Sequence, residues 1–307
     1  MAILNGIIKK MEGSIGDLTF KQVNGQTVVS QKITAISNPR TEAQMRTRTR
    51  FTNIVSMYRG IRPLLNNGFE HRPAGCSDYN MFVCINMQKE PVYLTKQQRS
   101  GGACVAAPYQ VTQGSLPSIV TTGTSQNIAT DISLGVDGIT TATTVGQFSQ
   151  SVVSNNADYH YGDQISFFLV KQKVNSETSI PYCEFHGWRV ILDASNTEKL
   201  WDVVNRNGFS AQDGYLAHSG NDGDCVFAWV HSRKSNGKTL VSSQSLIDAN
   251  SILSQYQGEL AFNLARSSYG EGRSAFLTPD ADTTTDTGNS NSGNGGNNGG
   301  GGGNDSL

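Results

Sequence analysis

The sequence lacks long hydrophobic runs, and this narrows the class of protein. No apolar stretch approaches the roughly 20 residues that a membrane-spanning helix needs, so we expect no membrane span. Residues 1–10 place their lysines after a short apolar patch, whereas a secretory signal has its charges first, so we expect no secretory leader. The 307 residues, 36% of them hydrophobic, are enough for a packed core and suggest about two domains.

The sequence also lacks any CxxC pair. Its five cysteines are widely spaced single residues: Cys76, Cys84, Cys104, Cys183 and Cys225. An odd, scattered set is not typical of a disulfide framework. Cys183 and His186 have half the spacing of a zinc site, but a second close pair of ligands is missing. We therefore predict reduced thiols, no metal and no cofactor.

Net charge is nearly absent, since the sequence has 24 basic and 25 acidic side chains. The balance hides an asymmetry, because residues 1–100 carry 14 basic and 6 acidic side chains, a net of +8. Residues 101–307 carry 10 basic and 19 acidic side chains, a net of −9. Such a split is typical of a basic segment that faces an acidic partner, or of two halves that attract each other. The counts leave both interpretations open.

The first hundred residues predict a hairpin followed by two helices. Asn24–Gly25 suits a tight turn between two short apolar strands, because both residues tolerate a positive φ. Asn38 and Pro39 predict a helix start, with Asn38 as the cap and Pro39 in the first position, and the helix should end before Pro63. A second helix is expected from Ser77.

The longer helix carries the most suggestive feature of the sequence, which is a set of arginines beside an apolar stripe. The stripe that helical spacing predicts to be buried is formed by Phe51, Ile54, Val55 and Tyr58. The candidate interface residues are Arg46, Arg48, Arg50, Phe51, Val55, Tyr58 and Arg59. The arginines could be solvated or paired within the chain, could face a protein partner, or could contact nucleic-acid phosphates. We expect a protein interface, with nucleic acid as the alternative.

From residue 101 the composition changes to Thr, Ser, Val and Gly, and helix formers become sparse. Short β-branched and aromatic runs separated by turn residues predict an antiparallel, immunoglobulin-like β-sandwich over residues 101–245. The runs are Ile165–Val170, Tyr182–Leu192, Cys225–His231 and Thr239–Val241. Asn236–Gly237 predicts a tight hairpin, residues 246–280 a helical extension, and the Gly/Asn-rich residues 281–307 a disordered tail.

No catalytic signature is present. There is no GxSxG motif, and we expect Cys104 to be a small buried residue instead of a nucleophile. Asp213, Asp222 and Asp224 lie among glycines without the order of a calcium loop, so we assign them to turns. We therefore predict a protein that is not an enzyme.

The start of the predicted longer helix has a distinctive motif, Asn38-Pro39-Arg40-Thr41, followed by Gln44, Arg48 and Phe51. This motif resembles the Asn-Pro-Lys/Arg-Thr opening of an uncharacterised family of Bacteroidota and their phages. Further similar segments are Gly68–Phe69, Ser77–Asn80 with Phe82, Val83 and Asn86, Gly114–Pro117 and Ser242–Ser245. The resemblance covers roughly residues 5–245 and implies no catalytic residue. It implies a bacterial or phage protein.

Together these features predict an α+β protein with a basic N-terminal module over residues 1–100, the sandwich, the helical extension and the tail. We expect a structural protein, such as a phage head or tail accessory protein, whose partners are other structural proteins or further copies of itself. The alternative is a nucleic-acid-associated protein that uses the arginine helix. The expected location is a virion or the bacterial cytoplasm.

Overall fold

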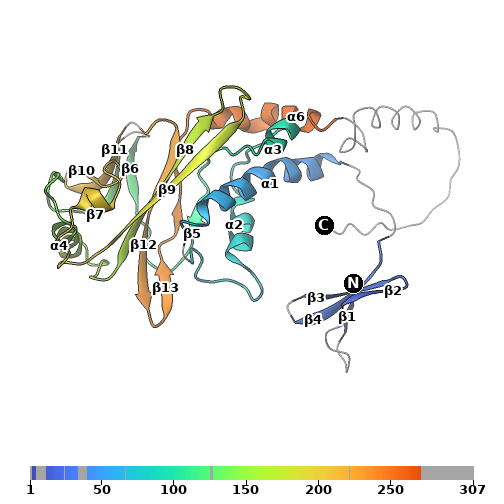
Figure 1. The fold of residues 1–307 in the computed structure, drawn as a ribbon, viewed down its shortest axis with the longest axis horizontal. Helices are drawn as coiled ribbons and strands as arrows, with labels where there is room; N and C mark the ends of the chain where they lie inside the picture. Colours follow the sequence, from blue (N-terminus) through green and yellow to red (C-terminus); the bar gives the residue numbers. More distant parts are fainter. Residues whose placement is uncertain are drawn as a thin grey trace.

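The computed structural model describes residues 2–4, 12–23, 25–33, 40–65, 67–124, 127–220 and 222–270 (Figure 1). The helices are α1 (Glu42–Ile61), α2 (Asp78–Asn86), α3 (Lys96–Ser100), α4 (Val145–Asn155), α5 (Leu200–Val203), the 3-10 helix η1 (Leu253–Tyr256) and α6 (Gly258–Ser267). The strands are β1 (Ala2–Leu4), β2 (Gly13–Ile15), β3 (Leu18–Val23), β4 (Gln26–Gln31), β5 (Gln110–Thr112), β6 (Thr121–Thr124), β7 (Asn127–Ser133), β8 (Gln164–Val174), β9 (Pro181–Ile191), β10 (Ser210–Gln212), β11 (Tyr215–Ser219), β12 (Cys225–Ser235), β13 (Lys238–Val241), β14 (Gln244–Ser245) and β15 (Ile247–Ala249). The predicted α+β class is confirmed.

The N-terminal strands form a small antiparallel sheet in the order β1-β4-β3-β2. The predicted hairpin is the β3–β4 pair, in which Val23 pairs with Gln26 across the turn. Gly25 has a φ of 79°, which a glycine adopts without a steric penalty. Among the described side chains of this sheet only Thr27 is buried, so the described part has no apolar core of its own.

Helix α1 begins one turn later than the sequence indicates. Its cap is Thr41, whose hydroxyl accepts a hydrogen bond from the Gln44 N–H, whereas Asn38 and Pro39 lie outside the described residues. It ends at Ile61, before Pro63, as expected.

The face of α1 that is buried differs in part from the predicted stripe. Phe51 is 38% exposed, while two polar residues, Thr49 and Asn53, are completely buried. The buried face consists of Met45, Thr49, Asn53, Ile54, Met57 and Ile61. A hydrophobic pattern assigns the buried face of a helix to the side with the most apolar residues. Because Thr49 and Asn53 are polar, the pattern did not include them in the buried face, and the predicted face differs from the observed one.

The centre of the molecule is an antiparallel sheet in the order β13-β12-β8-β9, with β15 also paired to β12. The predicted runs at 165–170, 225–231 and 239–241 lie in these strands, and the run at 182–192 extends one residue beyond β9. The predicted hairpin turn between β12 and β13 is also confirmed, because Asn236 and its neighbour Gly237 have φ values of 49° and 73°. Long apolar strands of this kind are expected where a sheet is covered on both faces.

Each face of β8 belongs to a different hydrophobic cluster. Phe168 and Val170 pack with α1, α2 and the segment after α3, whereas Phe167 and Leu169 pack with α4 and the second sheet. That second sheet has the order β10-β11-β7-β6, so the body has a helical layer, a central sheet and a further β layer (Figure 1). Antiparallel sheets are thus confirmed, but an immunoglobulin-like sandwich is not.

The first cluster also crosses the expected boundary at residue 100. Ile54 and Phe82 precede that position, Val105 follows it closely, and Val226 comes from a distant strand, yet all four belong to one cluster. Helix α4 lies in the region that was expected to be poor in helices. A Thr144–Gln147 capping box begins this helix.

A buried segment without secondary structure, Ala103–Tyr109, runs through the first cluster. Side-chain amides satisfy its backbone groups. Asn53 Oδ1 accepts from the Val105 N–H at 2.8 Å, and Asn53 Nδ2 donates to the Val105 carbonyl at 2.9 Å. Gln172 and Asn250 bind the N–H and the carbonyl of Ala106 in the same way. These contacts replace the ladder of hydrogen bonds that a strand would supply.

The predicted helix after Ser245 is wrong at its start. Residues Ile247–Ala249 form β15, which pairs with β12, and helical structure begins only with η1 and α6. Pairing with the central sheet overrides the helical spacing of the local sequence because the sheet offers backbone partners at this position. The predicted tail, residues 281–307, lies outside the described residues.

Candidate functional site

The structure separates the seven residues of the predicted interface. Arg46 points within the molecule, where its Nη2 lies 2.8 Å from Glu259 and 2.9 Å from Glu42, and its guanidinium lies 4.0 Å from the centre of the Phe262 ring. The hydrogen bonds that Arg46 donates to the carboxylates of Glu259 and Glu42 raise the pKa of Arg46 further above its usual value. Arg46 therefore joins α1 to α6.

Two more of the seven also pack within the chain. Tyr58 contacts the rings of Tyr79 and Phe82 in α2, at centroid distances of 5.2 and 5.4 Å, and burial raises the pKa of its hydroxyl. Arg50 is half-buried, and its Nε has no hydrogen-bond partner among the described residues.

The remaining four residues form the outer face of α1, which we define as Arg48, Phe51, Val55 and Arg59. Phe51 and Arg59 are exposed, and Arg48 and Val55 are half-buried. Helical spacing brings positions 48, 55 and 59 close to one line, with Phe51 beside it. Aromatic and arginine side chains are enriched in protein interfaces, so the composition of this face suits docking.

The N-terminal sheet adds a second surface that needs a partner. Ile15, Leu18 and Val23 expose 63%, 47% and 48% of their surface. Small sheets reach independent stability only when an apolar face packs against something. The sheet thus presents apolar side chains next in sequence to the basic helix.

Acidic side chains gather on the opposite layer, around α4, α5, β7 and β10, which lies across the central sheet from α1 and α2 (Figure 1). The exposed carboxylates of this acidic end are Asp131, Asp137, Asp158, Asp193, Glu198, Asp202 and Asp213. No lysine or arginine occurs between Arg99 and Lys171, and Lys199 and Arg206 are the exposed cations in residues 193–220. The charge asymmetry of the sequence is therefore also an asymmetry in space.

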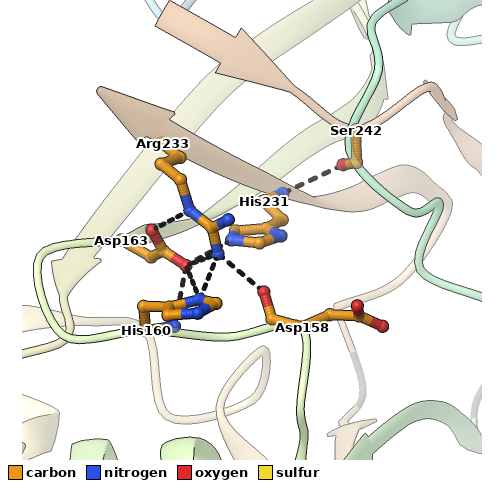
Figure 2. Close-up of polar contacts among 6 residues, drawn as sticks. All are labelled: Asp158, His160, Asp163, His231, Arg233 and Ser242. Carbon is orange, nitrogen blue, oxygen red and sulfur yellow. Dashed lines mark hydrogen bonds and ion pairs between the residues drawn. The ribbon is translucent and has the colours of Figure 1, made fainter. Parts of the chain in front are cut away.

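A buried polar network connects the segment just before β8 with strand β12. Asp163, 2% exposed, accepts hydrogen bonds from Arg233 Nε and Nη2, each at 2.7 Å, and its Oδ2 lies 2.9 Å from His231 Nε2 (Figure 2). Arg233 Nη2 also donates to the Asp158 carbonyl and to His160 Nδ1. The network ties the segment between α4 and β8 to strand β12.

Opposing effects set the pKa values in this network. Burial raises the pKa of Asp163, but the hydrogen bonds from Arg233, His160 and His231 outweigh it and hold the pKa below its usual range. Burial lowers the pKa of His231 more than the adjacent carboxylate raises it. The ring of His231 also stacks on Tyr159 at 4.3 Å, so the neutral imidazole is the favoured form.

The network resembles a serine triad in composition but not in geometry. Ser242 Oγ accepts a hydrogen bond from the backbone N–H of His231, not from its ring (Figure 2). The ring atom that is left, Nδ1, is buried and has no hydrogen-bond partner among the described residues. Since a triad requires the ring to contact the nucleophile, these three residues do not form one.

A second network repeats the arrangement near β11. Asp222 lies 2.9 Å from His218 Nε2 and 2.9 Å from Lys171 Nζ, and His218 stacks on Phe227 at 4.2 Å. Burial lowers the pKa of His218, as it does for His231. Asp222 thus pairs with charged partners across the fold and does more than terminate a turn.

The cysteines are thiols in the structure. Cys104 is buried, as expected, and its interaction with Cys183 together with burial raises the pKa of its thiol well above the usual value. A nucleophilic cysteine needs the opposite shift. Among the described residues no three His, Cys, Asp or Glu side chains converge in a way that could hold a metal ion.

The sequence reasoning missed both histidine networks. Asp163 and His231 are 68 residues apart in the sequence, and Lys171 and Asp222 are 51 residues apart. The available signal was a single charged residue, Asp163, immediately before a buried apolar run.

No helix in the described ranges has both the length and the apolar composition to cross a membrane. No family model, curated protein or solved structure matches the chain.

Proposed function

We propose that this protein is a non-enzymatic structural subunit that assembles head to tail with further copies of itself. The outer face of α1 in one copy docks against the acidic end of the next copy. The observation that carries the proposal is the separation of charge, with Arg59 and Arg62 exposed at the end of α1 in the helical layer and seven exposed carboxylates on the opposite layer.

Two further features support self-assembly. The two surfaces differ from each other, so their contact is heterologous and can repeat into a ring or a filament. The N-terminal sheet has exposed apolar side chains and lacks a buried core in its described part, so it gains stability by packing on a neighbouring copy. The resemblance to a family of Bacteroidota and their phages favours a virion, and a head or tail accessory protein, as the assembly.

Sedimentation velocity in 50 mM and 500 mM NaCl tests the proposal. We expect association that weakens at the higher salt concentration, because exposed charges are screened beyond about 10 Å at 0.1 M. The double variant R48E/R59E should sediment as a monomer at both concentrations. The variant K173E/K238E makes the same change in charge on exposed residues elsewhere and should associate like the wild type.

A charge reversal on the other surface sharpens the test. D131K/D137K should also abolish association, and the combination of both double variants should restore it, because glutamates would then face lysines. A wild-type protein that stays monomeric at every concentration and salt would contradict the proposal. Loss of DNA binding in R48E/R59E with unchanged association would instead support the nucleic-acid alternative.

A further inference from the structure

A cavity of about 340 Å³ lies where the helical layer stops short of the central sheet. Helix α1 ends at Ile61, and one wall is formed by residues that follow it, Leu64, Leu65, Asn67 and Gly68. The opposite wall is formed by residues of β8, β9, β12 and β13. Cavities of about 300–1,000 Å³ are typical of small-molecule sites.

The charged residues around this cavity all have the same sign. Arg189, Arg233 and Lys234 line it, and no aspartate or glutamate is among its described lining residues. Arg233 is neutralised by Asp163, so the uncompensated charge comes from Arg189 and Lys234. Arg189 Nη2 donates to the Leu64 carbonyl, which fixes the side chain at the wall and leaves its remaining N–H groups without a partner among the described residues.

The floor combines apolar surface with the buried hydroxyls of Ser166 and Thr112, and Thr112 already donates its proton to the Ser242 carbonyl. Phe168, Val230 and Val241 are buried lining residues. Ser166, 3% exposed, lies opposite Arg189 on β9 and Val230 on β12 in the sheet register. Its Oγ accepts a hydrogen bond from Gln164 at 2.8 Å, and no described residue accepts the hydroxyl proton. A buried donor without an acceptor is unfavourable unless something binds it.

From these features we infer that the cavity binds a small organic anion, in which a carboxylate or phosphate group is attached to an apolar body. The anionic group lies between Arg189 and Lys234 and accepts the Ser166 hydroxyl proton. The apolar body lies on Phe168 and Val230. Charge-assisted hydrogen bonds of this kind are stronger than neutral ones, so charge should decide which ligands bind.

A chemical-shift titration of the full-length, ¹⁵N-labelled protein tests this inference with three probes of similar size. The probes are benzoate, phenyl phosphate and neutral benzyl alcohol. We expect an anionic probe to bind at least about tenfold more tightly than benzyl alcohol. The amide signals of Gly68, Ser166 and Arg189 should shift. Binding of benzoate alone identifies a carboxylate site, and binding of phenyl phosphate alone identifies a phosphate site.

Matched variants then assign the charge. R189Q/K234Q should lose about tenfold or more in affinity for the preferred anion, whereas R99Q/K173Q removes two exposed cations elsewhere and should bind like the wild type. S166A should bind more weakly than the wild type with an unchanged unfolding midpoint. Equal affinity for all three probes, no binding of any, or unchanged affinity in R189Q/K234Q would overturn the inference.

Discussion

Replacing Asn53 by alanine tests whether the buried segment Ala103–Tyr109 depends on side-chain amides. Asn53 is completely buried in α1, and its amide makes the 2.8 and 2.9 Å hydrogen bonds to both backbone groups of Val105 and a 3.1 Å bond to the Tyr109 hydroxyl. The variant leaves the N–H and the carbonyl of Val105 without partners in the core.

The magnitude follows from those two groups. A buried polar group that loses its partner costs about 1–3 kcal/mol, so two groups cost about 4 kcal/mol. Alanine has a higher helix propensity than asparagine and returns about 0.5 kcal/mol. We expect N53A to lower the free energy of unfolding by about 3.5 kcal/mol, which corresponds to a fall of about 7–14 °C in the melting temperature.

The assay is urea unfolding monitored by circular dichroism, at one fixed protein concentration because association would shift the midpoint. The matched control is N263A, which makes the same substitution at an exposed position of helix α6. We expect the control to change the free energy of unfolding by less than about 0.5 kcal/mol. A loss below about 1 kcal/mol in N53A would refute the reasoning, because the segment would then find other partners.

Two further outcomes follow from the buried titratable groups. Burial lowers the pKa of His218 and His231, so the unfolded chain takes up protons first and stability should fall as the pH drops below about 6.5. Their partners Asp163 and Asp222 also have lowered pKa values, so the loss of stability continues below about pH 4. A urea midpoint that is equal at pH 7 and pH 5 would contradict the lowered pKa values of the two histidines. In thiol labelling of the native protein, exposed Cys84 should react quickly, whereas Cys104 and Cys225 should react only after unfolding. Burial raises the pKa of Cys225 to about 12, and rapid labelling of all five thiols would show that the core opens readily.

Features with a local cause could be predicted from the sequence. The turn at Asn236–Gly237 depends on two residues that tolerate a positive φ, and the apolar run 165–170 predicts a strand because its length and β-branched content are local properties. Helix α4 also carried a local signal, the Thr144–Gln147 capping box, but its Ser, Thr and Val content favoured a strand. The prediction for this region followed the composition, although the capping box indicated the helix correctly.

Features with a distant cause could not be predicted in the same way. Asn53 is buried because Val105 needs its amide, and Asp163 is buried because His231 and Arg233 surround it. In each case the partner is more than 50 residues away, and the residue types alone do not reveal the pairing. A hydrophobic pattern treats both residues as surface positions, so it placed Phe51 in the core in place of Asn53.

The body and the N-terminal sheet differ in the interactions that stabilise them, and this difference is relevant to assembly. The described part of the body has three apolar clusters, and buried side chains such as Asn53 and His231 form hydrogen bonds across the fold, so we expect it to fold without a partner. The described part of the N-terminal sheet has exposed Ile15, Leu18 and Val23 and one buried side chain, so packing on another surface would remove apolar area from water. A subunit with a stable body and an incomplete docking element can remain folded before assembly and gain order during it. That difference in stability, together with the separated charges, is the reason why we propose a structural role.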